Sequence, residues 1–149
     1  MLDKLILGTV QLGVNYGINN SEGKPSSEKS FDILNLAYEN GIRTLDTAEA
    51  YGNAQEVIGA FHKKNKHKKF NVITKLASSN LIKQEYFLDN LKNNCSLLNV
   101  EQLYGFMFHN FESFIENPKL YNELLEAKKL GLVKFTGISL YSDNEIKYI

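Results

Sequence analysis

The chain has 149 residues, 43% of them hydrophobic, and its 17 basic and 17 acidic residues leave a formal net charge of zero. This length suffices for one domain with its own core, and the charge balance argues against binding to nucleic acid or to a membrane surface. Cys95 is the single cysteine, so no internal disulfide can form, which suits a reducing compartment. No apolar run approaches the roughly 20 residues that cross a bilayer, and the N-terminus lacks the apolar region of a signal peptide. We therefore expect a soluble cytoplasmic protein.

Short apolar segments alternate with longer segments in which apolar residues have helical spacing. In chain order, the apolar segments predict strands at residues 5–7, 42–45, 70–75, 103–108 and 133–138. Helices are predicted at about 26–40, 53–61, 83–98 and 117–131, with a further helix from residue 143. Residues 11–25, rich in Gly, Asn and Ser, predict a long loop. Strands that alternate with helices imply a parallel sheet with right-handed crossovers.

Polar residues mark the expected helix starts. Ser26 or Ser27 is expected to cap the first helix. Asn53, followed by Glu56 three residues later, resembles a capping box. Asp143 is expected to cap the last helix.

A basic run at residues 62–69 follows the second predicted helix. It could bind phosphate or nucleic acid. However, it lies at a helix C-terminus, where cations complement the helix dipole, and it contains no aromatic residue. We interpret it as solvated surface.

The last four predicted strands each end on a different polar residue, in the order Asp46, Lys75, His109 and Ser139. The intervals of about 30 residues fit one βα unit each. The carboxyl ends of parallel strands lie at one edge of a sheet, where α/β proteins place their chemistry. A (β/α)8 barrel fits this pattern better than a doubly wound sheet, and neither a dinucleotide-binding fingerprint nor a P-loop follows the first strand.

Four side chains would then meet at this edge: Asp46, Tyr51, Lys75 and His109. An isolated tyrosine has a pKa of about 10, too high for ready proton exchange near neutral pH. A nearby ammonium favours the phenolate and lowers that pKa, a carboxylate can hold the ammonium, and an imidazole can orient a carbonyl oxygen. Together these groups predict a general acid directed at a carbonyl group.

Each of these residues also has a structural interpretation, as a turn acid, a packed loop aromatic, a rim lysine or a satisfied histidine. Their joint occurrence at successive strand ends favours the catalytic interpretation. As another alternative, Asp46 and Glu49 form a carboxylate pair of the glycosidase kind. Three positions apart in one loop, they are poorly placed to flank a bond from opposite sides. No spacing of His, Cys and carboxylates indicates a metal site.

Several segments resemble the aldo-keto reductase family. The stretch Gly-Ile-Arg-Thr-Leu-Asp-Thr-Ala-Glu-Ala-Tyr-Gly (41–52) is similar to a signature of that family, and so are segments 7–13, 73–75, 88–98, 108–109 and 137–139. The resemblance extends over all 149 residues in the same order. It implies a (β/α)8 TIM barrel and an oxidoreductase that reduces aldehydes or ketones with a nicotinamide cofactor, usually NADPH, with NADH as the alternative.

The resemblance also implies a catalytic role for each of the four side chains. Tyr51 would be the general acid that protonates the carbonyl oxygen. Lys75 would tune this phenol, and Asp46 would pair with Lys75. His109 would help to orient the carbonyl.

For the cofactor, the resemblance implies that Thr9 and Asp46 lie near the nicotinamide ribose. Ser139 would contact the carboxamide, and Leu140 stands where the family often has asparagine. The long polar loop 14–25 is similar to that of a branch found among bacterial sugar and polysaccharide genes. This similarity implies a small carbonyl substrate derived from a sugar.

A complete barrel of this type needs about 250 residues, so 149 residues supply about five of its eight strands and leave two unpaired sheet edges. We expect residues 1–149 to be a single domain, the N-terminal part of the barrel, present as a fragment or a truncated product. Self-association through the open edges is the alternative. The family's adenosine-phosphate site lies on later strands. A non-catalytic assembly or regulatory subunit with the same fold is a second functional hypothesis.

Overall fold

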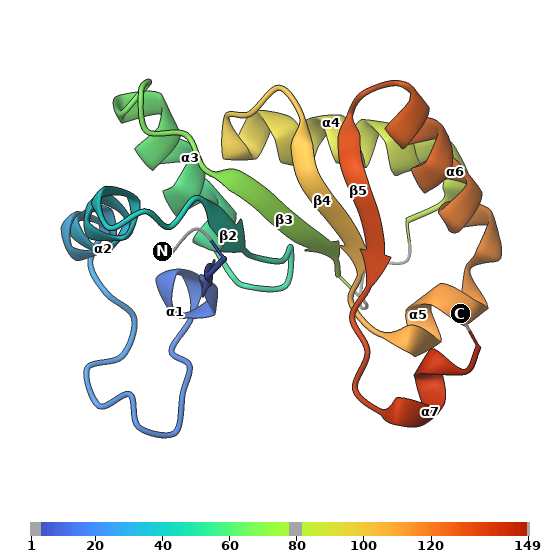
Figure 1. Ribbon diagram of the computed structural model, residues 1–149, viewed down its shortest axis with the longest axis horizontal. Coiled ribbons are helices and arrows are strands. Elements are labelled where there is room, and N and C mark those ends of the chain that lie inside the picture. The colour runs from blue at the N-terminus through green and yellow to red at the C-terminus, as the bar shows by residue number, and fades with distance from the viewer. Residues whose placement is uncertain (1–3, 78–81, 149) are drawn as a thin grey trace.

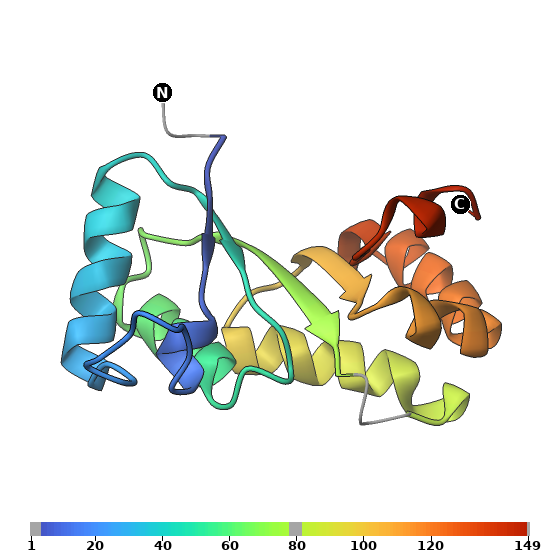
Figure 2. The same cartoon turned by 90° about the horizontal axis from the view of Figure 1, so that it is seen from below.

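The computed structural model describes residues 4–77 and 82–148, which form one parallel sheet flanked by helices (Figures 1 and 2). The strands are β1 (Ile6–Gly8), β2 (Thr44–Asp46), β3 (Asn71–Leu76), β4 (Leu103–Phe108) and β5 (Val133–Ile138). Each strand pairs in parallel with the next one along the chain. All five predicted strands are confirmed, and the first three are shifted by one or two residues.

The helices are α1 (Val10–Gly13), α2 (Ser27–Glu39), α3 (Ala54–Lys64), α4 (Phe87–Leu98), α5 (Phe111–Glu116), α6 (Pro118–Lys129) and α7 (Asp143–Ile146), with a 3₁₀ turn, η1, at Gln84–Tyr86. The sequence does not predict α1 or α5, because four and six residues are too few to show a helical period. The expected loop at 11–25 therefore begins inside α1. In the described ranges, no helix combines the length and the apolar character that a bilayer crossing requires.

The two faces of the sheet differ in exposure. Residues that pair across parallel strands point to the same face, and one face carries Leu45, Val72 and Phe106, which are almost completely buried. The Phe106 ring packs against Phe87 of α4 with centroids 5.9 Å apart. In Figure 2, α3, α4 and α6 lie on this side of the sheet.

The opposite face of the sheet is open. Ile6 and Phe135 lie on it and are 53% and 49% exposed. In a closed barrel this face lines the interior, where side chains of alternate strands fill the core in layers. The curved sheet of five strands confirms the predicted incomplete (β/α)8 barrel, with β1 and β5 as its two edges.

Helix caps agree with the prediction at α2 and differ at α3 and α7. The Ser26 side chain accepts a hydrogen bond from the first turn of α2. Asn53 precedes α3 but makes no capping hydrogen bond, because its backbone is not extended and its side-chain oxygen contacts Lys24 Nζ. The predicted capping box at Asn53 is therefore wrong. At α7 the cap is Ser142, one residue before the predicted Asp143.

Gly59 allows α3 to lie directly against α4. A Cβ atom at this position would lie 1.8 Å from the backbone oxygen of Leu97. Any larger residue would push the two helices apart and disturb the packing between them. Since α3 is the next helix after β2, this contact also helps to hold the loop between β2 and α3 in place.

His62 is an exception to the solvated surface expected at residues 62–69. It is fully buried in α3, where Nδ1 lies 2.8 Å from the Leu98 oxygen and Nε2 accepts a hydrogen bond of 3.1 Å from the Phe70 N–H. Only a neutral imidazole has one donor and one acceptor nitrogen. Burial lowers the pKa of His62 and so favours this neutral form. The side chain joins α3 to the end of α4 and to the residue before β3.

We expect acidification to destabilise the protein through His62. Its pKa is lowered in the folded state, whereas the unfolded chain titrates it near pH 6.5. The stabilisation is therefore complete above about pH 6.5 and is lost as the pH falls below that value, by up to about 1.4 kcal/mol per pH unit. Urea unfolding between about pH 7.5 and 5.5 measures this slope. His62→Gln should reduce the slope, whereas His67→Gln, at an exposed position, should not. Equal slopes in the wild type and His62→Gln would contradict the expectation.

Candidate active site

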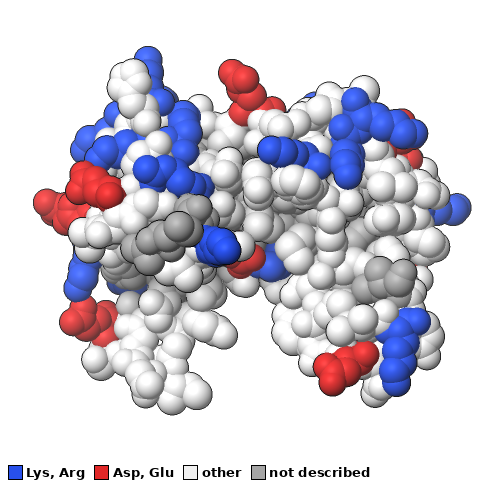
Figure 3. Space-filling view, viewed as in Figure 1, with Lys and Arg blue, Asp and Glu red and all other residues white. Residues whose placement is uncertain are grey.

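The carboxyl ends of the five strands form one edge of the sheet, at the lower side of Figure 1. The loop at residues 14–25 projects on one side of this edge, and α5 and α7 lie on the other. The surface is notched between these two lobes, with acidic and basic atoms at the closed end of the notch (Figure 3).

An ion pair joins the ends of β2 and β3. Lys75 Nζ lies 2.5 Å from Asp46 Oδ1 and donates a second hydrogen bond of 3.1 Å to the Thr47 carbonyl oxygen. The Lys75 side chain is only 7% exposed, whereas Asp46 is 32% exposed. A buried ammonium needs such partners, because its desolvation is costly without them.

Tyr51 and His109 lie beside this pair. Lys75 Nζ is 5.2 Å from the centroid of the Tyr51 ring. The Tyr51 and His109 rings meet edge to face, with centroids 6.1 Å apart. The fold thus brings together the four side chains that the sequence places at separate strand ends.

The environment of His109 favours a neutral imidazole. Burial lowers the pKa of His109, and the charge of Lys75 lowers it further, while the carboxylates of Asp46 and Glu49 act in the opposite direction. The Nδ1 atom is buried and has no hydrogen-bond partner among the described residues. A neutral ring with an unsatisfied nitrogen at a reactive edge is suited to bind a polar group of a ligand.

Thr9 and Ser139 lie at the two outer strands of the same edge. Thr9 is fully buried, and both its N–H and its hydroxyl donate to the Asp46 carbonyl oxygen, at 3.0 and 2.9 Å. Thr9 therefore fixes the backbone that carries the Asp46 carboxylate. Ser139 follows β5, and its N–H donates to the Phe108 oxygen at 3.0 Å, next to His109.

Glycines allow a close approach at the turn that carries Tyr51. A Cβ atom at Gly13 would lie 1.7 Å from the backbone carbonyl oxygen of Tyr51, so only glycine lets the end of α1 pack on this turn. Gly52 has a φ angle of +55°, in the left-handed region that other residues rarely adopt. The Tyr51 N–H also donates to the Ala48 oxygen, which closes the turn.

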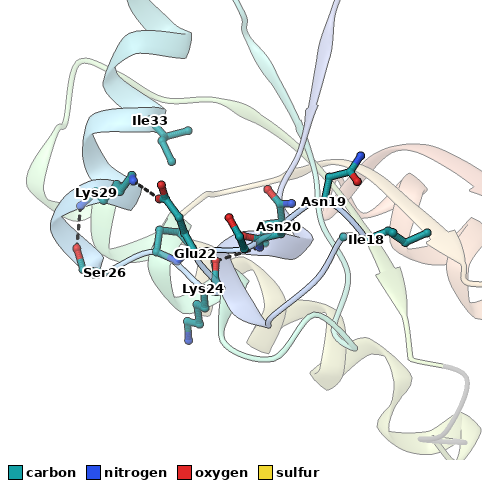
Figure 4. Close-up of a pocket in the computed structure, with 13 residues that line it drawn as sticks. Ile18, Asn19, Asn20, Glu22, Lys24, Ser26, Lys29 and Ile33 are labelled. Carbon is teal, nitrogen blue, oxygen red and sulfur yellow. Dashed lines mark hydrogen bonds and ion pairs between the residues drawn. The ribbon is translucent and has the colours of Figure 1, made fainter.

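A separate hollow of about 800 Å³ lies between the loop 14–25 and α2. Figure 4 shows Glu22 paired with Lys29 and the Lys29 N–H bonded to Ser26. Most of the residues that line the hollow are exposed and polar, and none of the four clustered side chains contributes to it. We therefore place the candidate active site at the cluster and not in this hollow.

Glu49 is not free to act as a second catalytic carboxylate. Its Oε2 accepts from the Ala77 N–H at 2.9 Å, and its Oε1 accepts from Asn94 Nδ2 at 2.7 Å. The sequence does not reveal these contacts, because the partners are 28 and 45 residues away. Both oxygens are occupied, which argues against the glycosidase alternative. Within 4–77 and 82–148, no group of three or more His, Cys, Asp or Glu residues could hold a metal ion.

A five-stranded parallel sheet with a polar cluster at its carboxyl edge defines part of a (β/α)8-barrel protein. The model of the aldo/keto reductase family matches residues 4–149, and the chain therefore belongs to that family. A comparison with curated proteins gave no match.

Solved structures of several aldo-keto reductases share the fold. A putative aldo-keto reductase from Pseudomonas aeruginosa, PA4992, superposes with a TM-score of 0.74 at 24% identity, over 90% of this chain and 54% of that one. The holo form of AKR11C1 from Bacillus halodurans gives 0.73 at 21% identity, over 97% and 48%. AKR2E4 from Bombyx mori, in complex with NADP, gives 0.71 at 18% identity, over 97% and 48%. The chain thus spans about half the length of these structures.

We expect Asp46→Asn to destabilise the protein by about 1–3 kcal/mol, because it leaves the buried Lys75 ammonium without its anionic partner. The loss should be smaller than the 3–5 kcal/mol of fully buried pairs, since Asp46 is partly exposed. Chemical denaturation at pH 7 measures it. Glu22→Gln is the control, because it breaks an exposed pair with Lys29 and should cost much less stability than Asp46→Asn. Equal losses in the two variants would show that the Asp46–Lys75 pair contributes no more to the free energy of unfolding than an exposed ion pair.

Proposed function

We propose that this protein takes part in the NAD(P)H-dependent reduction of an aldehyde or ketone to an alcohol. Membership of the aldo/keto reductase family supports an oxidoreductase of this type. The observation that carries the proposal is the Asp46–Lys75 ion pair beside the Tyr51 ring, which also packs edge to face on His109. The same residues also give each step of the reaction a donor or a counter-charge.

Tyr51 is the proposed general acid. Its phenol gives a proton to the carbonyl oxygen, and the phenolate that remains is stabilised by the adjacent Lys75 ammonium. Asp46 holds this ammonium in place. Neutral His109 donates a hydrogen bond that orients the carbonyl oxygen, since a neutral imidazole still carries one N–H. Once the alcohol leaves, the phenolate regains a proton from solvent.

The residues of this edge fit the nicotinamide end of the cofactor, which supplies the hydride that is added to the carbonyl carbon. About one third of the Asp46 side chain is exposed and can accept a hydrogen bond from a ribose hydroxyl. Thr9, which holds the Asp46 backbone, forms the adjoining wall. Ser139, directly after β5, is the proposed contact of the carboxamide. NADPH is the proposed cofactor, with NADH as the alternative.

We further propose that residues 1–149 form a single domain, the N-terminal part of the barrel. The chain spans about half of the solved aldo-keto reductases that it matches. For the substrate we propose a small carbonyl compound derived from a sugar, because the polar loop 14–25 lies at the carboxyl edge of the sheet (Figure 1). We also propose that the protein acts in the cytoplasm.

Replacement of Tyr51 by phenylalanine should lower kcat by about 10²–10⁴-fold, because only the proton donor is lost. NADPH affinity, measured by fluorescence titration, should change little. NADPH oxidation with a broad panel of aldehydes and sugar-derived carbonyls gives kcat and KM. Tyr86→Phe is the matched control, since this exposed tyrosine lies in η1, outside the cluster and outside the loop 14–25.

Protein that neither binds NADPH nor oxidises it with any compound of the panel would overturn the proposal. A Tyr51→Phe variant with wild-type kcat would remove Tyr51 from its role and leave the family assignment intact.

A non-catalytic assembly or regulatory subunit is the second candidate function. The exposed apolar side chains of Ile6 and Phe135 on the open sheet face, and the unpaired edges at β1 and β5, favour it because such surfaces promote association. Size-exclusion chromatography with light scattering, with and without NADPH, distinguishes the two. A stable oligomer that ignores NADPH supports the assembly function, and a species that binds NADPH and turns over substrate supports the reductase.

A further inference from the structure

Glu49 lies in the turn between Asp46 and Tyr51, and three of its groups bind to the neighbouring elements. Its N–H donates to the Lys75 oxygen at 3.1 Å. Its carboxylate accepts from the Ala77 N–H and from Asn94 Nδ2. The residue therefore contacts Lys75 of β3 and Ala77 directly after that strand, and it reaches α4 as well.

A buried polar network continues from Glu49 into the protein. Asn94 of α4 is 4% exposed, and its Oδ1 accepts from Gln55 Nε2 at 2.8 Å. The same Gln55 amide, in α3, donates to the Thr74 hydroxyl of β3 at 2.7 Å. The network thus connects the turn to α3, α4 and the strand that carries Lys75. Hydrogen-bonded networks in a buried setting hold their members in one arrangement.

The pattern of donors around Glu49 requires a carboxylate. A backbone N–H and a side-chain amide N–H₂ both point at its two oxygens, and an ionised carboxylate only accepts. Hydrogen bonds to an ionised acceptor are about twice as strong as neutral ones. Glutamine would place one NH₂ group against one of these donors, so it cannot satisfy both.

We propose that Glu49 is a positioning residue that fixes the turn of Tyr51 relative to Lys75 and His109. The proposal rests on the proposed reductase function and assigns Glu49 no contact with substrate or cofactor. Tyr51 follows Glu49 by two residues, while Lys75 precedes Ala77 by two, so the Glu49 contacts tie the two reacting segments together close to the side chains that must meet. A displacement of about 1 Å between catalytic groups can cost about 100-fold in rate.

The charge of Glu49 has a second, separable effect. Its carboxylate raises the pKa of His109, as Asp46 does, against the lowering by burial and by Lys75. Removal of this charge should therefore move the His109 titration to lower pH. A shorter residue that keeps the charge should leave the titration nearly unchanged and still lose the reach to Ala77 and Asn94.

The experiment compares Glu49→Gln and Glu49→Asp with Glu56→Gln, a matched control at an exposed position of the following helix α3. Steady-state kinetics, NADPH binding and NMR titration of His109 are measured on the full chain. Both changes at Glu49 should lower kcat by about tenfold or more, with KM and NADPH affinity within about twofold of wild type. Only Glu49→Gln should shift the His109 titration downwards, and Glu56→Gln should change neither quantity.

Two further results decide the proposal if a variant is unstable or the wild type is inactive. Asn94→Ala removes one partner of Glu49 from the other side, and its effect on kcat should be smaller in the Glu49→Gln background than alone. A wild type that neither binds NADPH nor turns over any compound of the panel overturns the reductase function. The ring signals of Tyr51 and His109 then test Glu49, since they must shift in Glu49→Gln and not in Glu56→Gln. Unchanged kcat or unchanged ring signals in Glu49→Gln would overturn the positioning role.

Discussion

The ion pair between Asp46 and Lys75 is the interaction on which the arrangement of this sheet edge depends. Lys75 is nearly inaccessible to water, so its charge is tolerated only with Asp46 and the Thr47 carbonyl beside it. The partners of the pair are themselves fixed. Thr9, directly after β1, holds the Asp46 backbone, and Glu49 binds the Lys75 carbonyl oxygen and the Ala77 N–H at the end of β3. Three neighbouring strands are therefore joined at the level of the reacting groups.

The described strands and loops carry the residues of both the proposed proton transfer and the proposed nicotinamide contacts. The proposed proton donor, Tyr51, lies in the turn after β2, and its counter-charge, Lys75, lies on β3. The proposed nicotinamide contacts lie at the same edge of the sheet. The face of the sheet that carries Asp46 and Lys75 also exposes Ile6 and Phe135, which a closed barrel would bury in its interior. The apolar side of β2 to β4 packs fully against α3, α4 and α6, so the local geometry of the proton donor is supported by a complete core on that side (Figure 2).

Most elements follow from local patterns, and the differences have local physical causes. The strands at 103–108 and 133–138 match β4 and β5 residue for residue. β4 is the mainly apolar run typical of a buried parallel strand, whereas β5, at the sheet edge, is mostly exposed or half-buried. The capping box at Asn53 does not form, since Lys24, from a distant loop, contacts the side chain that would cap α3. His62 belongs to a basic run and yet is buried between Leu98 and Phe70, which no charge pattern indicates. Periodic features can therefore be predicted from the local sequence, whereas these side-chain contacts cannot, because their partners come from distant segments.

The sequence by itself determined the alternation of strands and helices, the identity of the polar residue at each strand end and the resemblance to the reductase family. Parallel strands share one carboxyl edge, so Asp46, Lys75 and His109 had to lie at the same edge of the sheet. The resemblance also implies the pair of Lys75 with Asp46, which the structure contains. Only the tertiary structure decided that Thr9 bonds to the Asp46 backbone and that Glu49 faces Ala77 and Asn94. These contacts join residues 28 to 45 positions apart, and their geometry depends on strand register and helix packing, which local patterns do not specify.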